Sequence, residues 1–551
     1  MYELGKIFSA VKNGDTVVLE KDKVYDVWQD DCLELTGYFC SNTASVEENP
    51  NGYRRVALHL KDKENVTIDG NGATIMIHGI MTPILLDKCK NIVIKNLTID
   101  YARPTMNEYS IDKKDGDRYE ITINPEILYE IRDNQIYWQG EKDKNGKPLW
   151  ETGYKGIDMI TLYMHPETAK YEYAHMYDDD CRPSIPTIET VEELGDHRLA
   201  LTFVNKNAYF PVGAVGQTRC IIRDQLGSFF RDCVNLTLEN MTIYCMHGFG
   251  LLSQYCDTVT FKNLNCTPKS GRTIASNADF FHFSGCKGLI TIDGCRASGA
   301  HDDFINVHGT YLRIEKADRE NNSLLLLFEH PQSWGFEAFH VGDTVSFVKW
   351  DTLIDYAQAT VLSAEKVDDK HIRVTLDKAL PEMEEGKDVL DNLTWKSELV
   401  VTNNWFGPSS GHGFLCSGAG KRVLIENNEF INNVYGVISV ACDCNFWFES
   451  GRNKEVIFRK NKVVRCGSYE TRDEMPVCRV VPNVMSEKSQ QYVHGTLVIE
   501  NNVFLDPPKG YYDFDFNYIE KVIMRNNVFD KTYEIKQRCV GKIKEKGNKI
   551  L

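Results

Sequence analysis

Three aspartates within residues 271–311 are the side chains of this chain best placed to do chemistry. If two segments of this stretch stack as consecutive turns of a coil, Ala-Asp-Phe-Phe-His-Phe lies over Asp-Asp-Phe-Ile-Asn-Val. Asp303 then falls on Asp279, and Asp302 falls on Ala278. Carboxylates packed this closely repel one another, which raises at least one pKa. Such a patch is costly for stability, but it suits an enzyme that moves protons at neutral pH.

The spacing of the acids indicates how they would divide the work. Neighbouring strands of a sheet lie about 4.8 Å apart, so Asp279 and Asp303 have room for one water between them, while Asp302 is aimed elsewhere. That division suits an inverting glycosidase, in which one acid protonates the leaving oxygen and a base about 6.5–9.5 Å away activates water. In the other interpretation, the Asp302-Asp303 pair only starts a strand or binds a cation, as in calcium-dependent β-helix lyases.

A column of neutral polar side chains is expected on the same face as the acids. Because residues alternate faces along a strand, His282, Asn306 and His308 point outward, and Gln254 from one coil further up falls in line with His308. These hydrogen-bonding groups are what the hydroxyls of a sugar need. His308 is equally well explained as a stacked structural histidine.

A repeated phrase defines the elements that must hold this patch. Cys233-Val-Asn-Leu-Thr-Leu-Glu-Asn240 returns after 23 residues as Cys256-Asp-Thr-Val-Thr-Phe-Lys-Asn263. A fixed period of this size is typical of a solenoid, and strand-forming residues with Asn at a recurring corner predict an all-β fold, a parallel β-helix. Stacked Asn side chains can bond from coil to coil, and Asn tolerates the left-handed conformation of a tight corner.

Two stretches interrupt the repeat and divide the chain into five parts. In 105–215 and 312–400 longer alternating strands replace the Asn ladder, which predicts two inserted antiparallel β-barrel or sandwich modules. The remaining parts are N-terminal coils at 1–104, central coils with the aspartates at 216–311, and C-terminal coils at 401–551. The second module leaves the coil directly after the Asp302-Asp303 strand, so we expect it to wall one side of the site.

The composition narrows the choice of ligand and compartment. The net charge of −16 disfavours nucleic acid, anionic membranes and, more weakly, polyanionic polysaccharides, so a neutral glycan is the easier partner. The chain has no apolar run of about 18 residues and no apolar leader at its start. We therefore expect a cytoplasmic protein in this form, or a secreted or periplasmic one if a leader was removed. The 17 cysteines recur inside apolar strand patterns and lack zinc-site spacing, which predicts reduced core residues and no metal or cofactor.

Two consecutive motifs match a known family. Asn277-Ala-Asp-Phe-Phe-His-Phe-Ser-Gly-Cys-Lys-Gly288 followed by His301-Asp-Asp-Phe-Ile-Asn-Val-His-Gly309 resembles glycoside hydrolase family 110. This family comprises α-1,3-galactosidases that remove the terminal galactose of blood-group B type structures. The resemblance spans most of the chain, with further landmarks at Asp100-Tyr-Ala-Arg-Pro104 and Trp447-Phe-Glu-Ser-Gly451.

The resemblance implies a fold, a reaction and a set of site residues. It implies a right-handed parallel β-helix with two inserted β modules, and exo-acting, inverting hydrolysis without a metal or cofactor. Its catalytic trio matches Asp279, Asp302 and Asp303. The candidate substrate-binding residues are Arg272, Gln254, His282, Asn306, His308, Trp447 and Glu449. We expect a glycan substrate, with no nucleic acid and no membrane, and we leave a homodimer open.

One departure from the family keeps alternatives open. After the second module we expect Ala-Arg-Gly-Ile-Leu, but this chain has Gly411-His412-Gly-Phe-Leu. A related β-helix exo-glycosidase of different sugar specificity therefore stays an alternative. A polysaccharide lyase would need a calcium site and an Arg or Lys base, and a carbohydrate-binding β-helix would need no acid trio. The trio is also distantly similar to that of polygalacturonases, family 28, whose basic cluster for a uronate carboxylate we do not find here.

Overall fold

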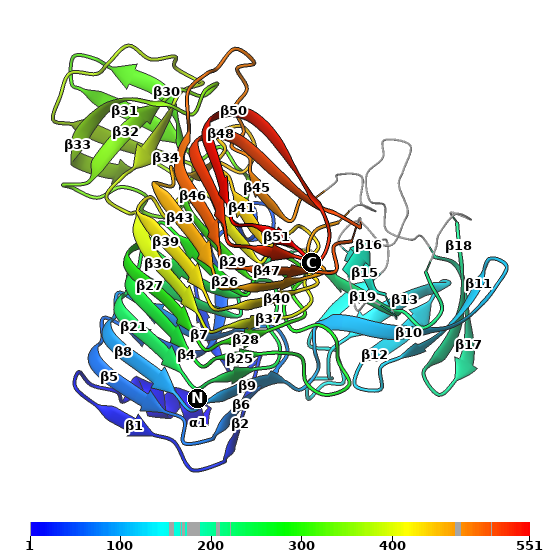
Figure 1. Ribbon diagram of the computed structural model, residues 1–551. Coiled ribbons are helices and arrows are strands. Elements are labelled where there is room, and N and C mark those ends of the chain that lie inside the picture. Colours follow the sequence, from blue (N-terminus) through cyan, green and yellow to red (C-terminus); the bar gives the residue numbers. More distant parts are fainter. Residues whose placement is uncertain are drawn as a thin grey trace.

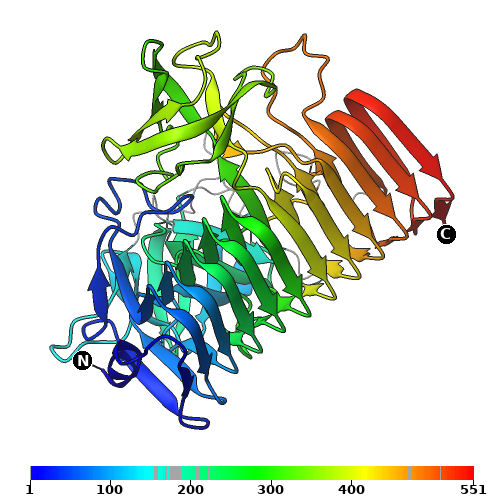
Figure 2. The same ribbon diagram turned by 90° about the vertical axis from the view of Figure 1, so that its left-hand side faces the viewer.

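A right-handed parallel β-helix forms the body of the protein, as predicted (Figure 1). The computed structural model describes residues 2–153, 159–165, 167, 171–173, 188–204, 210–220, 222–468, 475–508 and 510–551. The strands of the coils stack into three parallel ladders, and Figure 2 shows them side by side from the blue N-terminal coils to the red C-terminal coils. The fold class expected from the repeat is therefore confirmed.

The three ladders are numbered by the order of their strands within one coil. The first ladder runs through β4 (Arg54–Lys61), β7 (Thr82–Asp87), β20 (Ser228–Arg231), β23 (Leu251–Gln254), β26 (Phe281–Ser284), β29 (Ile305–Thr310), β38 (Phe414–Cys416), β41 (Ile438–Val440), β45 (Cys478–Val480) and β48 (Tyr512–Arg525). The second ladder runs through β1 (Thr16–Val18), β5 (Glu64–Asp69), β8 (Lys90–Lys95), β21 (Val234–Glu239), β24 (Asp257–Lys262), β27 (Lys287–Asp293), β36 (Ser397–Thr402), β39 (Arg422–Glu426), β43 (Glu455–Arg459), β46 (His494–Glu500), β48 and β50 (Tyr533–Lys546). The third ladder runs through β2 (Val24–Trp28), β6 (Thr74–His78), β9 (Thr98–Tyr101), β22 (Thr242–Ile243), β25 (Asn265–Cys266), β28 (Arg296–Ala297), β37 (Trp405–Phe406), β40 (Glu429–Ile431), β44 (Lys462–Val464), β47 (Val503–Leu505), β49 (Val528–Phe529) and β51 (Lys549–Ile550).

The interior of the solenoid is filled by one side chain in two from each strand. Phe281 pairs with Ile305 and Phe283 with Val307 across β26 and β29, and all four belong to the central apolar core. Helix α1 (Glu3–Ser9) covers the N-terminal end of this core with Leu4 and Phe8. The open end of a solenoid needs such a cap to keep its apolar interior from water.

Asparagines hold the corner between the second and third ladders in two columns. The outer column, which includes Asn240 and Asn263, has positive φ and bonds from coil to coil, as predicted. The inner column lies one residue later in the chain and is buried. In the N-terminal coils it is apolar, as at Leu264, whereas in the C-terminal coils it is Asn, as at Asn428 and Asn461. Each buried Asn accepts bonds from the preceding coil and caps a strand carbonyl there.

Two antiparallel modules interrupt the coils, as predicted, and they project from different sides of the solenoid (Figure 1). The first has a seven-stranded sheet of β10 (Met106–Asp115), β11 (Arg118–Ile123), β15 (Met159–Met164), β16 (Tyr171–Tyr173), β17 (Ile188–Gly195), β18 (Arg198–Phe203) and β19 (Val215–Cys220), and a three-stranded sheet of β12 (Leu128–Arg132), β13 (Gln135–Gln139) and β14 (Glu151–Gly153). The second is a closed barrel of β30 (Leu312–Asp318), β31 (Ser323–Leu327), β32 (Thr344–Val348), β33 (Asp355–Lys366), β34 (His371–Leu376) and β35 (Val389–Asn392).

Short antiparallel strands and a buried tyrosine attach further segments to the first ladder. Strand β3 (Leu33–Leu35) pairs with β4, and β42 (Glu449–Ser450) pairs with β29. Tyr255, at the end of β23, packs into the barrel core and donates a hydrogen bond to the carbonyl of Ala338. Across the described ranges the structure contains no helix with the length and apolar character that a membrane crossing requires.

We predict that Asn461→Ala destabilises the solenoid by about 3 kcal/mol, because three buried hydrogen bonds to the neighbouring coil lose a partner. Asn461 accepts from the backbone and the side chain of Asn428 and donates to the carbonyl of Ile425. Thermal melting followed by circular dichroism measures the loss. Asn427→Gly on the exposed outer column keeps the positive φ accessible and is the matched control. Equal melting temperatures for the two variants would contradict a stabilising inner column.

Candidate active site

The three aspartates meet on the outer face of the first ladder. Asp279 lies just before β26, and Asp302 and Asp303 lie just before β29, its neighbour in the ladder. One carboxylate oxygen of each acid therefore lies within 4.8 Å of the other two. The side chains of Asp279 and Asp303 are only 4% and 5% exposed, whereas that of Asp302 is 36% exposed. Two acids are thus enclosed, and the third is open to an approaching molecule.

The acids are closer together than the acid and base expected for an inverting glycosidase. The separation of about 6.5–9.5 Å that we expected is typical of such enzymes, but the nearest oxygens here lie within 4.8 Å. The reason is that all three acids come from two adjacent coils, whose strands lie about 4.8 Å apart. The register of β26 on β29 keeps the backbones of Asp279 and Asp303 one strand spacing apart.

Asp279 is held by a histidine of its own strand. Its Oδ2 lies 2.6 Å from Nδ1 of His282. Burial, and then the charge of Asp303, raise the pKa of Asp279 from 3.8 to about 8. Both effects favour the protonated form of this carboxyl.

Asp303 is held from the next coil of the first ladder. Its Oδ1 accepts from the backbone N–H of His412 at 2.6 Å and lies 2.8 Å from that residue's Nδ1. A side chain at Gly411 would collide with the backbone of Asp302 and Asp303, so only glycine lets this loop come so close. Burial and the charge of Asp302 raise the pKa of Asp303, and the His412 backbone N–H opposes that rise.

Asp302 faces a cation. Its Oδ2 lies 3.2 Å from one guanidinium nitrogen of Arg223. The other terminal nitrogen of this guanidinium donates to the carbonyl of Asn42. Burial, and then the charge of Asp279, raise the pKa of Asp302 to about 6, while Arg223 lowers it. A group with a pKa near the working pH is suited to general acid catalysis.

The predicted polar column forms in register beside the acids. Gln254, Ser284 and His308 stack in line, as do His282 and Asn306. Nε2 of His282 lies 2.7 Å from Nε2 of His308, and Oδ1 of Asn306 is buried without a hydrogen-bond partner. The order of the column is confirmed, and a role of its members in binding substrate stays a prediction.

Glu449 joins this group from β42. One of its oxygens accepts from the Asn42 amide at 2.8 Å, the other accepts from the Ser417 hydroxyl at 3.0 Å, and the first lies 3.9 Å from Nε2 of His308. Burial raises the pKa of Glu449, but its polar neighbours, among them the donors of Asn42 and Ser417, outweigh burial, so its pKa lies below its ordinary value.

Three residues predicted to bind substrate lie elsewhere or serve other partners. Gln254 is buried beneath the N-terminal loop, where it accepts from the N–H of Ser41 and donates to a carbonyl of the same loop. Arg272 is paired with Asp100 and Glu126 rather than with the catalytic candidates, because it joins the first module to the solenoid. Trp447 is 37% exposed, and its ring packs at 4.4 Å against that of His330 at the edge of the barrel.

Sequence reasoning missed the groups that approach from distant segments. His412 stacks on Asp303, and extending the register of Asn306 with Leu415 would have found it. Arg223 follows the first module, and Asn42 comes from an N-terminal loop; no local pattern points to either of them.

The same acids are also the candidates for a metal site among the described residues. Their oxygens are close enough to share one cation. Each acid, however, already has a polar partner: His282 at Asp279, Arg223 at Asp302 and His412 at Asp303. Acidic clusters are common without a metal, so we assign no ion here.

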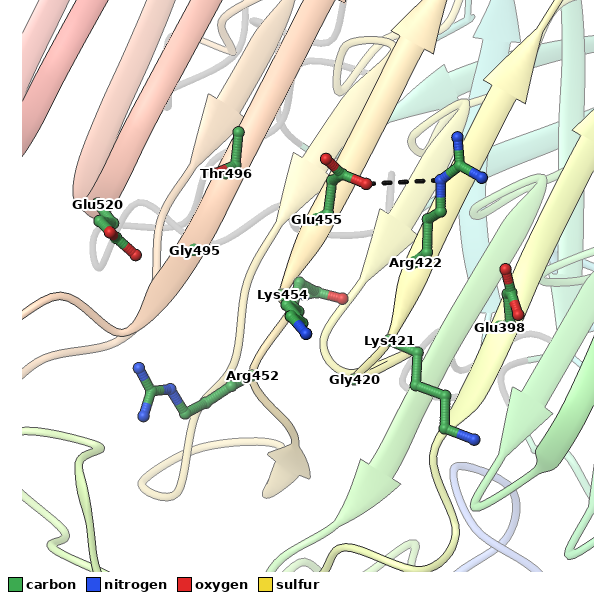
Figure 3. Close-up of a pocket in the computed structure, with 11 residues that line it drawn as sticks. Glu398, Gly420, Lys421, Arg422, Arg452, Lys454, Glu455, Gly495, Thr496 and Glu520 are labelled. Carbon is green, nitrogen blue, oxygen red and sulfur yellow. Dashed lines mark ion pairs between the residues drawn. The ribbon is translucent and has the colours of Figure 1, made fainter.

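A separate hollow of about 680 Å³ lies on the second ladder and is lined by none of the acids of the trio (Figure 3). It lies over the beginnings of β39, β43 and β46. Two of its cationic side chains form ion pairs, Arg422 with Glu455 at 3.4 Å and Arg452 with Asp355 at 3.2 Å. This surface is a solvated face of the sheet.

The chain is similar to several known proteins. A family model described as GLAA-B beta-barrel domain II matches residues 323–390. Alpha-1,3-galactosidase A of Bacteroides fragilis (strain YCH46) is 32% identical over 533 residues, which cover 95% of this chain and 83% of the relative. Alpha-1,3-galactosidase B of Phocaeicola vulgatus is 29% identical over 555 residues, which cover 97% and 89%. A hyperthermoactive exopolygalacturonase from Thermotoga maritima aligns with a TM-score of 0.39 and 11% identity over 99% of this chain and 86% of its own.

The β-helix and its carboxylate cluster, taken with these relatives, define a glycoside hydrolase. The chain belongs to the α-1,3-galactosidase family, glycoside hydrolase family 110, which its motifs resemble.

We predict that Asp279→Asn stabilises the protein at pH 8 by several kcal/mol and has little effect at pH 4. The folded-state pKa of about 8 lies above the ordinary 3.8, so the native protein loses stability as the pH rises between these values. Asparagine mimics the protonated acid but cannot ionise. Melting temperatures across this pH range measure the effect, with Asp117→Asn at an exposed turn as the control. A stability difference that stays constant with pH would contradict the raised pKa.

Proposed function

We propose that the protein removes terminal α-1,3-linked galactose from glycans with inversion of configuration. The observation that carries this proposal is the unequal setting of the three acids. Asp302 is the exposed one and has a pKa near 6, whereas Asp279 and Asp303 are enclosed and each is tied to a histidine. Asp302 can thus donate a proton to a leaving group, and Asp279 and Asp303 can bind the attacking water.

In this mechanism water is the nucleophile. It lies between Asp279 and Asp303, at the carboxylate oxygens that His282 and His412 leave unoccupied. The water gives one proton to the base as its oxygen bonds to the anomeric carbon. Asp302 gives its proton to the glycosidic oxygen as the bond from that oxygen to the anomeric carbon breaks. After the reaction the base carries an extra proton and Asp302 lacks one. A proton then passes from the base to Asp302, either directly between the adjacent carboxyls or through solvent.

The choice of sugar and linkage is supported by the named relatives. Several are alpha-1,3-galactosidases, and two of them cover most of this chain. In the polar column, Oδ1 of Asn306 is buried without a hydrogen-bond partner and suits a sugar hydroxyl rather than a charged group, whereas the ring nitrogens of His282 and His308 already have partners. Exo action is supported by the burial of Asp279 and Asp303, which leaves approach through Asp302. His412 in place of the expected arginine keeps a different sugar specificity as the alternative.

We predict that Asp302→Asn lowers kcat/KM for an α-1,3-galactosyl disaccharide by about 10²–10⁴-fold, and far less for an aryl α-galactoside with a good leaving group. An activated phenol needs little protonation as it leaves, so it bypasses the general acid. Asp303→Asn is the matched comparison, since the base is needed for both substrates. Equal losses with both substrates in Asp302→Asn would assign the acid to another residue.

We predict that the first product is the β-anomer of galactose. Proton NMR of the fresh hydrolysate, recorded before mutarotation, reads the configuration directly. The short separation of the acids makes this the most informative measurement, because carboxyls about 5–5.5 Å apart are typical of retaining enzymes. An initial α-anomer would mean that an aspartate attacks the sugar. A parallel screen of aryl α- and β-glycosides and of galactosyl disaccharides tests the sugar and the linkage.

A further inference from the structure

A continuous chain of short contacts runs from Asp279 to a backbone carbonyl behind the site. Oδ2 of Asp279 lies 2.6 Å from Nδ1 of His282, and Nε2 of His282 lies 2.7 Å from Nε2 of His308. Nδ1 of His308 lies 2.7 Å from the carbonyl oxygen of Gly309. Both histidines are buried, at 0% and 3% exposure, so water does not supply alternative partners.

The chemistry of its ends gives this chain a direction. A carbonyl oxygen only accepts, so Nδ1 of His308 must carry a proton. The two Nε2 atoms that face each other need one proton between them. If both rings are neutral, that proton belongs to His282, and Nδ1 of His282 is then an acceptor. The remaining contact, between His282 and Oδ2 of Asp279, also needs a proton, and it can only come from the carboxyl.

We propose that His282 and His308 are positioning residues that keep Asp279 in its protonated form, which leaves Asp303 as the single ionised base. This inference rests on the proposed function, because it divides the work between the two acids that share the water. During the reaction the water's proton passes to Asp303 as the new carbon–oxygen bond forms. Asp279 accepts a hydrogen bond from the water and keeps its own proton toward His282.

The contacts of Asp303 have the opposite direction. A guanidinium nitrogen of Arg479 lies 2.9 Å from Nε2 of His412, and since arginine only donates, that nitrogen is an acceptor. A neutral His412 then carries its proton on Nδ1 and donates it to Asp303. The backbone N–H of His412 donates to the same oxygen. Burial and the charge of Asp302 raise the pKa of Asp303, and the two donors of His412 oppose that rise by favouring its ionised carboxylate, whereas Asp279 faces an acceptor, which favours the acid.

The charged groups around Asp279 decide where the shared proton rests. Asp302, Asp303 and Glu449 favour keeping a proton in the chain, and Arg223 opposes it. The proton has two other places, the rings of His282 and His308. Burial, and then His308, push the pKa of His282 well below its ordinary value, so the ring does not retain the proton. With both rings neutral, the proton rests on Asp279.

The first test breaks the chain at His308. In His308→Phe the ring of His282 loses its acceptor and can turn its proton toward Asp279, which then ionises. The added negative charge raises the pKa of Asp302 and Asp303, so both limbs of the pH profile of kcat/KM should move to higher pH by about one unit. A merely structural role for His308 lowers the rate without moving either limb, and that result would overturn the proposal.

Two comparisons make this test specific. In the Asp279→Asn background the same His308→Phe change should move neither limb, because no carboxyl remains to ionise; an equal shift there would also overturn the proposal. His494→Phe replaces a buried histidine of β46 that bonds to the backbone of Asn453, and it should leave both limbs in place.

A second pair of variants does not depend on the folding of His308→Phe. Asparagine at 279 keeps a donor toward His282, so Asp279→Asn should lose about 10-fold in kcat/KM, whereas Asp303→Asn should lose about 10³-fold. Equal losses would overturn the assignment.

A readout that needs no turnover separates this inference from the proposed function. Infrared spectra at neutral pH should show the carbonyl stretch of a protonated carboxyl in the wild type but not in Asp279→Asn. An absent wild-type band would refute the protonated Asp279 whatever the substrate. A wild type that shows the band but cleaves no α-1,3-galactoside would refute only the proposed function.

Discussion

The hydrogen-bond ladder between parallel coils is the constraint on which the rest of this molecule depends. It fixes the register of β26 on β29, and this register places Asp279 and Asp303 one strand spacing apart. The repulsion between them is a cost that the solenoid bears because its interior of stacked aromatic and aliphatic side chains is continuous from coil to coil. A one-residue slip of this register would separate the two aspartates along the ladder and would also turn every inward side chain of the strand outward.

The three acids differ because each one meets a different neighbour. Asp302 faces the guanidinium of Arg223, Asp303 faces two donors of His412, and Asp279 faces an acceptor on His282. Three similar carboxyls within one patch thereby acquire three different affinities for a proton. Pairs of titratable groups whose environments push their pKa values apart are what acid and base catalysis requires.

Local periodicity made the solenoid and its register predictable from the sequence. Contacts between segments far apart in the chain were not predictable in this way. The repeat at Asn240 and Asn263 and the alternation through β26 and β29 led to the coil, the stacking of the acids and the polar column. The burial of Gln254 beneath the loop at Ser41 could not be predicted, because these residues are brought together only by the folded chain. The partners of Arg272 could not be predicted for a related reason: Glu126 belongs to the first module, whose docking no repeat specifies.

The modules and the N-terminal loop explain how a bare β-helix becomes this site. Around the acids, the outer face of the first ladder carries mainly carboxylates and neutral groups. The cation that pairs with Asp302, Arg223, comes from a segment outside this ladder. Arg223 comes from the segment that returns from the first module, and it is held in place by the carbonyl of Asn42. The amide of Asn42 in turn binds Glu449, which the barrel-side segment brings against β29. A loop near the start of the chain, the return from the first module and a strand near the barrel are thus linked through one asparagine. The setting of Asp302, the most exposed of the three acids, therefore depends on these three segments docking correctly, although the acids themselves need only the coils.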